Sequence, residues 1–189
     1  MVTPLSTTRR LMTYEELVAL PSTRDHDRTE LIAGEPIVSP SPGRKHQRCV
    51  YLLSRVVGDA VEAANFGQLF FAPMDVRLAP MTVLQPDLLV LRHELLATNA
   101  PEGIIDGPPD LVIEVISPFS RTRDEVTKRA IYEQAGVAEY WLVDPERKRV
   151  TLLSLTDKGY QEIAPGRSGV VSALIPGLII DPTALFAGL

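Results

Sequence analysis

Two short stretches decide the fold of this chain: QPDLLV, residues 85–90, and DLVIEV, residues 110–115. Each is an apolar segment that carries a carboxylate, because Asp87 stands at the start of the first and Glu114 lies inside the second. An ionised carboxylate among valines and isoleucines loses its hydration at considerable cost unless it is paired, protonated or bound to a metal. The first hypothesis is therefore a divalent-cation site built on two strands.

Length and composition are those of one ordinary globular domain covering residues 1–189. The chain is 45% hydrophobic and 23% charged, which is enough apolar material for a sizeable core. Its one cysteine, Cys49, excludes an intrachain disulfide and lacks the partners of a cysteine-based zinc site. We therefore expect a reducing compartment, the cytoplasm.

Charge and hydropathy limit the choice of partners. The N-terminal residues lack the apolar core of a signal peptide, and no later segment reaches membrane-spanning length without proline or charge, so no membrane partner is expected. The formal charge of -5 and the pI near 5.2 argue against a general nucleic-acid coat. They leave room for a local basic groove.

The N-terminal part predicts a helix followed by a hairpin. Thr13 and Glu16 have the spacing of a capping box, and Pro21 ends the short helix that they begin. Residues 29–38 have the pattern of two strands that turn near Gly34.

Farther along, apolar periodicity predicts a long helix at 45–64 with one inward stripe, on which His46 also falls. A second helix at 124–135 is closed by Gly136, a residue typical of the left-handed position after a helix end. The order of helices and strands indicates an α/β fold with a mixed sheet flanked by helices. The stripe consists of Val50, Leu53, Val57, Ala60 and Ala64; strands are expected at 68–72, 74–79, 87–92, 110–117, 139–144, 149–155 and 160–164, and a terminal helix at 181–186.

The second helix places a lysine on its inward face, which is unusual. Lys128 shares that face with Asp124 and Tyr132, so it can reach Glu114 if the helix packs beside the strand at 110–117. Carboxylates from neighbouring strands could hold Mg²⁺ or Mn²⁺, and such a metal activates water and stabilises charge on a phosphoryl group. Phosphodiester hydrolysis is the reaction that this set favours.

With these residues the sequence resembles the PD-(D/E)XK nuclease superfamily, and more closely a bacterial family of small restriction-endonuclease-like proteins, many of unknown function. The resemblance runs from about residue 30 to 155 and is strongest in residues 85–90 and 110–146. It implies a restriction-endonuclease-like core, with a mixed central β-sheet flanked by helices, behind an N-terminal extension of helix and hairpin.

The resemblance also implies roles for individual residues. Asp87 would be the motif aspartate, Glu114 the acid of the (D/E)-X-K element, and the backbone carbonyl of Val115 a further metal ligand. The lysine expected two residues after Glu114 is replaced by Ile116, so Lys128 would have to stand in for it.

Three accessory residues are also implied. Glu30 would add a carboxylate to the metal shell, His46 would contact phosphate or assist proton transfer, and Asp124 lies one helical turn from Lys128. Each has a structural alternative: an exposed strand position for Glu30, a capping or core histidine for His46, and a helix cap for Asp124.

The central residues have structural alternatives as well. Asp87 could be a turn carboxylate after Pro86, Glu114 could form a buried salt bridge with Lys128, and Lys128 could extend past its neighbours to solvent. Trp141 is expected in the core, with base stacking as the alternative. The basic residues Arg44, Lys45, Arg121 and Arg123 are candidates for phosphate contacts, with scattered solvated charge as their alternative.

The sequence thus predicts a Mg²⁺- or Mn²⁺-dependent endonuclease acting on nucleic acid, in particular DNA. A homodimer is a further expectation, since cutting both strands often needs two sites. The alternative from another class is a nuclease-like binding module that has lost its chemistry, as Ile116 would allow. Convergence of the carboxylates of Asp87 and Glu114 beside Lys128 distinguishes the enzyme from the module.

Overall fold

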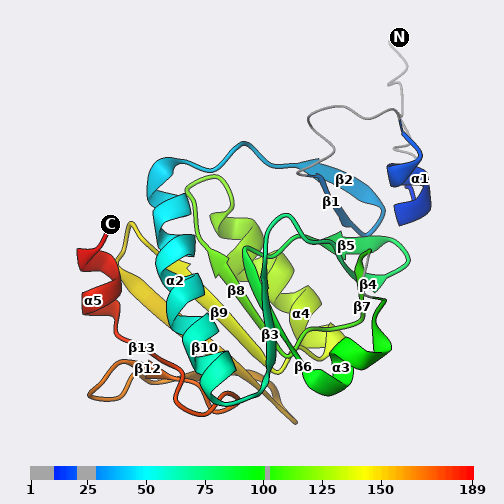
Figure 1. Ribbon diagram of the computed structural model, residues 1–189. Helices are drawn as coiled ribbons and strands as arrows, with labels where there is room; N and C mark the ends of the chain where they lie inside the picture. Colours follow the sequence, from blue (N-terminus) through cyan, green and yellow to red (C-terminus); the bar gives the residue numbers. More distant parts are fainter. Residues whose placement is uncertain (1–10, 21–28, 101–102) are drawn as a thin grey trace.

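A six-stranded mixed sheet forms the centre of the computed structural model, which describes residues 11–20, 29–100 and 103–189 (Figure 1). One neighbouring pair, β8 with β9, is parallel, and the other pairs are antiparallel. The expected mixed sheet flanked by helices is confirmed. The strands, in spatial order, are β11 (Gly159–Ile163), β10 (Arg149–Thr156), β9 (Glu139–Asp144), β8 (Leu111–Val115), β6 (Leu88–Arg92) and β3 (Gly67–Phe71).

Helices cover both faces of this sheet. On one face, α2 (Arg44–Ala63) and α5 (Pro182–Ala187) contact the apolar cluster that contains Ile113 and Trp141. On the other face, α4 (Arg129–Ala135) inserts Tyr132 into a second cluster. Because successive strand residues point to opposite faces, this double cover explains why DLVIEV is a nearly continuous apolar run.

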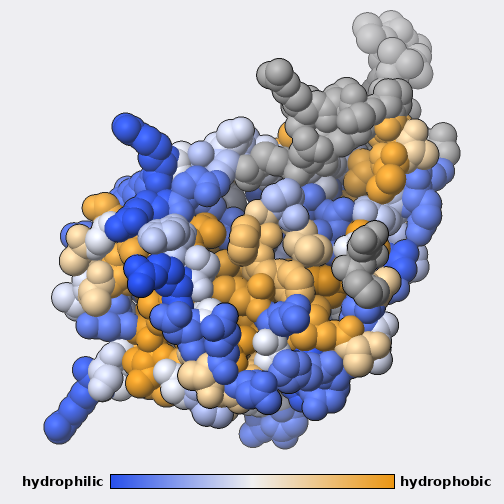
Figure 2. Space-filling view, in the orientation of Figure 1, coloured by the Kyte–Doolittle hydropathy of each residue, from blue (hydrophilic) through white to orange (hydrophobic). Residues whose placement is uncertain are grey.

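The long helix buries a line of residues that differs in part from the predicted stripe. Cys49, Leu53, Val57 and Val61 are buried, whereas Val50, Ala60 and Ala64 pack only partly against the same core. The middle of the stripe is as predicted, at Leu53 and Val57, and its ends differ by one residue, at Cys49 in place of Val50 and at Val61 in place of Ala60. Figure 2 shows hydrophilic side chains over the outer surface of α2 and an apolar area beside it, where β3 lies in Figure 1.

A smaller sheet carries the N-terminal hairpin. Its hairpin turns at Ala33 and Gly34, both with positive φ, as the glycine predicted. Helix α1 (Tyr14–Val18) packs Leu17 against Leu31 of this sheet, and both hydrogen bonds of its predicted capping box are present. The strands, in order, are β2 (Glu35–Val38), β1 (Thr29–Ile32), β5 (Thr82–Leu84), β4 (Val76–Ala79) and β7 (Ile105–Asp106).

Most predicted elements are present, with shifted ends. The second predicted helix begins at Arg121, three residues earlier than expected, and contains a wide π-helical turn, η2 (Arg123–Lys128), before α4. Gly136 ends it with φ 92°, and the predicted terminal helix is present as α5, which Asp181 caps. Short elements were not anticipated: β5, β7, α3 (His93–Thr98), β12 (Val170–Val171) and β13 (Ile179–Ile180).

No helix among the described residues is both long and apolar enough to cross a membrane.

A buried carboxylate fastens the C-terminal segment to the main sheet. Glu139 is 1% exposed and accepts hydrogen bonds from Trp141 Nε1 and Ser172 Oγ, at 2.9 and 2.8 Å. It also accepts the backbone N–H groups of Ala173 and Leu174, at 2.7 and 3.0 Å. Three of these four donors belong to residues 172–174, so the Glu139 carboxylate is a major link between β9 and that segment.

Replacing this carboxylate should destabilise the protein strongly. Glu139→Ala would remove the acceptor of two buried side-chain donors, Trp141 Nε1 and Ser172 Oγ, and of the partly buried N–H of Ala173, so we expect the free energy of unfolding to fall by about 3 kcal/mol. Urea unfolding followed by circular dichroism measures the change. Glu162→Ala is the matched control, because Glu162 is half exposed and paired with Arg149 on the surface. This control should change stability by less than about 0.5 kcal/mol, and an equal loss in both variants would contradict the assigned role of Glu139.

Candidate active site

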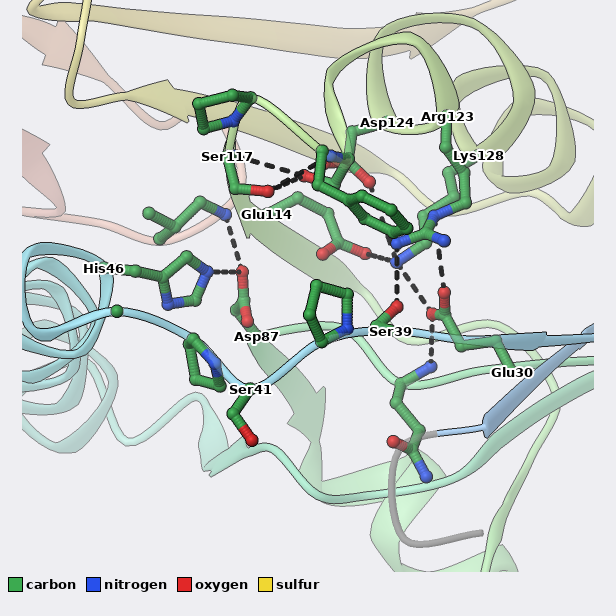
Figure 3. A pocket seen from close by; sticks show the side chains of 18 residues that line it. Glu30, Ser39, Ser41, His46, Asp87, Glu114, Ser117, Arg123, Asp124 and Lys128 are labelled. Carbon is green, nitrogen blue, oxygen red and sulfur yellow. Dashed lines mark hydrogen bonds and ion pairs between the residues drawn. The ribbon is translucent and has the colours of Figure 1, made fainter. Parts of the chain in front are cut away.

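Strand pairing brings the two predicted acids together. Leu88 of β6 is opposite Ile113 of β8, and one further step in this antiparallel register places Asp87 opposite Glu114. Opposite residues of an antiparallel pair face the same side of the sheet. Asp87 Oδ2 also accepts the backbone N–H of Val115 at 2.8 Å, which fixes the aspartate against β8. Both acids line one cavity of about 270 Å³ (Figure 3).

Lys128 enters this cavity from η2 and is surrounded by carboxylates. Its Nζ lies 2.8 Å from Glu114 Oε1, 2.7 Å from Glu30 Oε1 and 3.8 Å from Asp124 Oδ1. With 3% of its surface exposed, the lysine does not extend to solvent as the structural alternative proposed. The predicted salt bridge with Glu114 is present, and it lies inside the cavity with Asp87.

Glu30 is a buried member of the same cluster. It is 4% exposed, so the structural alternative of an exposed strand residue is wrong, because Lys128 and Arg123 of η2 lie against its carboxylate. Its Oε1 also accepts the backbone N–H of Gln85 at 2.9 Å. Its Oε2 lies 3.7 Å from Arg123 Nε and has no hydrogen-bond partner among the described residues. This buried carboxylate oxygen can therefore accept a further hydrogen bond or bind a cation.

His46 lies on the opposite side of the cavity, at the start of α2. Its Nε2 is 3.1 Å from Asp87 Oδ2, so this ring and the backbone of Val115 hold the same carboxylate oxygen. The other ring nitrogen, Nδ1, is buried and has no partner within the described part of the chain. Figure 3 shows His46 and Lys128 approaching the two strand acids from different elements.

The charges of the cluster shift one another's protonation. Burial raises the pKa of Glu114 well above its ordinary value, and Lys128 offsets only part of this effect because Asp124, Asp87 and Glu30 oppose it. Burial likewise raises the pKa of Asp124. For Lys128, burial alone would lower the pKa, but Glu114, Glu30 and Asp124 outweigh it, and the net shift is upward. The lysine is thus an ammonium, and the carboxylates compete for it.

The missing motif lysine has a structural explanation. Ile116 is 4% exposed and belongs to the apolar cluster that contains Tyr132 and Leu142. A lysine there would put its stem and charge into that cluster, at a high desolvation cost. The ammonium comes instead from η2, whose Lys128 shares Glu114 Oε1 with the hydroxyl of Tyr132 at 3.0 Å.

The candidate phosphate-binding residues separate into two groups. Arg123 lines the cavity, where its Nη2 donates to Ser39 Oγ at 2.9 Å. Arg121 instead pairs with Asp144 and Glu125 outside the lining. Arg44 and Lys45 are exposed at the start of α2, next to lining residues Gly43 and His46.

Some site residues were not singled out from the sequence. Ser39 and Gln85 hold Arg123 and Glu30, and Phe119 lines the cavity although it is 64% exposed. No local pattern marks the first two, because each acts on a residue far away in the chain. Trp141 is fully buried, so its expected core packing is confirmed, and it presents no face to a base.

The composition of the cavity fits a divalent cation. Four carboxylates face two cationic side chains, Lys128 and Arg123, and an oxygen of Glu30 is unpartnered. Hard oxygen donors in excess are what Mg²⁺ and Mn²⁺ require. Within residues 11–20, 29–100 and 103–189, no three histidine, cysteine or acidic side chains converge as a ready-made metal cage. The carboxylates are drawn toward Lys128, and Asp87 with Glu114 remain the pair that would hold the ion.

A mixed sheet that presents two acids from adjacent strands beside a helix-borne lysine defines a restriction-endonuclease-like fold. A family model described as "Putative restriction endonuclease" matches residues 14–183, and the chain belongs to this family, Uma2.

A solved structure supports the fold. A protein from Anabaena variabilis, whose crystal structure is described as that of a "putative nuclease", is similar with a TM-score of 0.76 and 21% sequence identity. The match covers 94% of this chain and 98% of that one. No curated protein matches the sequence.

Removing the ammonium of Lys128 should destabilise the protein, because the buried carboxylates around it repel one another. We expect Lys128→Met to lower the free energy of unfolding by about 3 kcal/mol at neutral pH, because buried carboxylates would lose their counter-ion. The raised pKa of Glu114 means that its protonated form is the one the folded state favours. The difference in free energy of unfolding between the wild type and Lys128→Met should therefore become smaller as pH falls toward the ordinary glutamate pKa of 4.5. It should become larger as pH rises through the raised pKa of Glu114.

Urea unfolding of both proteins at several pH values between about 5 and 8 measures this dependence. Lys45→Met is the matched control, since Lys45 is half exposed and pairs with an exposed glutamate. Its effect should be small and independent of pH. A Lys128→Met deficit that does not change with pH would contradict the proposed competition among carboxylates.

Proposed function

We propose that this protein is a Mg²⁺- or Mn²⁺-dependent endonuclease that hydrolyses phosphodiester bonds of nucleic acid, in particular DNA. The observation that carries the proposal is that Asp87, which directly precedes β6, lines the same cavity as Glu114 of the neighbouring strand β8 and Lys128 of η2. Convergence of these three side chains is what the enzyme requires and the inactive module does not. The family description and the fold point in the same direction.

In this proposal, Asp87, Glu114 and the backbone carbonyl of Val115 hold the cation. The bound cation would lower the pKa of a water molecule and stabilise negative charge on the phosphoryl group. His46 keeps the Asp87 carboxylate in place through its 3.1 Å contact. Glu30 and Asp124 divide the charge of Lys128 with Glu114 and so leave part of the Glu114 charge free for the metal.

Lys128 acts as a cation rather than as a base. Its upward-shifted pKa keeps the proton on Nζ, so it cannot take a proton from water at neutral pH. Its contribution is to orient Glu114 and to offset negative charge as phosphate approaches. Position 116 does not need a lysine for this, because η2 already supplies the ammonium.

The proposal extends to the substrate and the assembly. Exposed Arg44 and Lys45, beside the cavity at the start of α2, are suited to contact phosphates of a strand that crosses the opening. A homodimer would supply the two sites that cutting both strands often needs. We further propose that residues 1–189 act as one domain in the cytoplasm, where Cys49 remains a buried thiol whose pKa burial raises to about 12.

Metal binding can be measured without knowing the substrate. Calorimetric titration of Mn²⁺ and Mg²⁺ should show saturable binding to the wild type, and Asp87→Asn and Glu114→Gln should abolish it. These substitutions keep the shape of each side chain and remove a negative charge. Glu162→Gln, on β11 at the sheet edge, should bind as the wild type does. Binding that survives in both site variants would contradict the assigned ligands.

Cleavage tests the function itself. Incubation of supercoiled plasmid DNA with Mn²⁺ or Mg²⁺ should produce nicked or linear products, and chelation should stop it. We expect Asp87→Asn and Glu114→Gln to lower the rate by about a hundredfold or more, because the charge that holds the metal is lost. If purified activity were unchanged in both variants, the endonuclease proposal would fail. Metal binding without any cleavage would favour the binding module.

A further inference from the structure

An exposed aromatic ring stands at the opening of the acidic cavity. Phe119 lines the cavity with Asp87 and Glu114, yet 64% of its surface is exposed. Isolated exposed apolar residues are common and need no explanation by themselves. This one differs because it adjoins the proposed reaction site and lies five residues after Glu114 in the chain.

The ring is held by a rigid turn. Ser117 and Ser120 close this turn by reciprocal hydrogen bonds. Each backbone N–H donates to the hydroxyl of the other serine at 3.1 Å, and the two hydroxyl oxygens lie 3.0 Å apart. The N–H of Arg121 also donates to the carbonyl of Ser117 at 3.1 Å. The turn comes one residue after the end of β8, so these bonds hold the backbone at Phe119 in place relative to Glu114.

A guanidinium group supports the ring from one side. Arg123 Cζ lies 5.8 Å from the centre of the Phe119 ring, within the range of a cation–π contact. Arg123 is itself fixed, because Ser39 accepts its hydrogen bond and Glu30 lies 3.7 Å from its Nε. The contact supports part of the ring, while most of its surface is open to solvent.

We propose that Phe119 is a stacking platform for an unpaired nucleobase, so that the preferred substrate at this site is single-stranded DNA or duplex DNA with locally unpaired nucleotides, such as those that supercoiling opens. Exposed aromatic rings beside a phosphate-handling site bind bases without regard to sequence, since every base has a stacking face. In an intact duplex those faces are covered by neighbouring base pairs, and a base must leave the stack to reach such a ring. This inference rests on the proposed function and specifies its substrate.

Binding without cleavage tests the platform. A fluorescein-labelled oligothymidine of about twelve nucleotides and a blunt duplex of equal length serve as probes, with Ca²⁺ as the oxygen-seeking cation. We expect Phe119→Ala to weaken single-strand binding about tenfold, as loss of one stacked base predicts, and to leave the weaker duplex binding unchanged. Val126→Ala is the matched control, because Val126 is 62% exposed on η2 and lies outside the cavity lining.

A second variant separates stacking from a structural role. Phe119→Trp should keep the affinity for oligothymidine, and its emission should be quenched when a base stacks on the ring, whereas the buried Trp141 of the wild type should show no quenching. The inference is overturned if Phe119→Ala binds the single strand like wild type, if it weakens both probes equally, or if the wild type binds neither.

These results are distinguishable from failure of the proposed function. Loss of cleavage in Asp87→Asn, together with unchanged single-strand binding in Phe119→Ala, would support the endonuclease proposal and contradict the stacking role of Phe119. If the protein cleaves no DNA but Phe119→Ala selectively loses single-strand binding, the stacking role of Phe119 is supported and the protein is a binding module.

Discussion

The ammonium of Lys128 is the interaction on which the rest of the site depends. Glu30 comes from the small sheet, Glu114 from the central sheet and Asp124 from η2, and all three are buried. Without a shared cation these charges would repel one another in a medium that screens them poorly. One side chain therefore joins the two sheets and the helix, and it does so at the place where the chemistry is proposed.

The same arrangement explains why the cluster suits a metal. A single ammonium cannot neutralise the surrounding carboxylates. Burial is the main cause of the raised pKa of Glu114, and the negative charges of Asp124, Asp87 and Glu30 add to it. A divalent cation between Asp87 and Glu114 would relieve that excess of negative charge. In the proposed function, relief of this electrostatic strain would contribute to the affinity for the ion.

Much of the fold could be predicted from local patterns. The capping box at Thr13, the turn at Gly34 and the end of α4 at Gly136 depend on neighbouring residues, and the structure has all of them. The placement of Asp87 and Glu114 in one cavity could be predicted, because one acid begins an apolar segment and the other lies inside a second one. The burial of Glu30 and the exposure of Phe119 could not be predicted in this way, because both depend on which distant segment of the chain lies beside them.

The wide turn of η2 has a consequence for the history of this chain. Asp124, Lys128 and Tyr132 follow one another at intervals of four, whereas an ordinary α-helix completes a turn in 3.6 residues, so such a line drifts around its axis. A π-helical turn holds more residues and compensates for that drift. Deleting one residue between Asp124 and Lys128 would restore an ordinary helical turn, and it would shorten their spacing to three and so move Asp124 out of line with Lys128 and Tyr132. Insertions and deletions at this place should therefore be rare among descendants that keep the site.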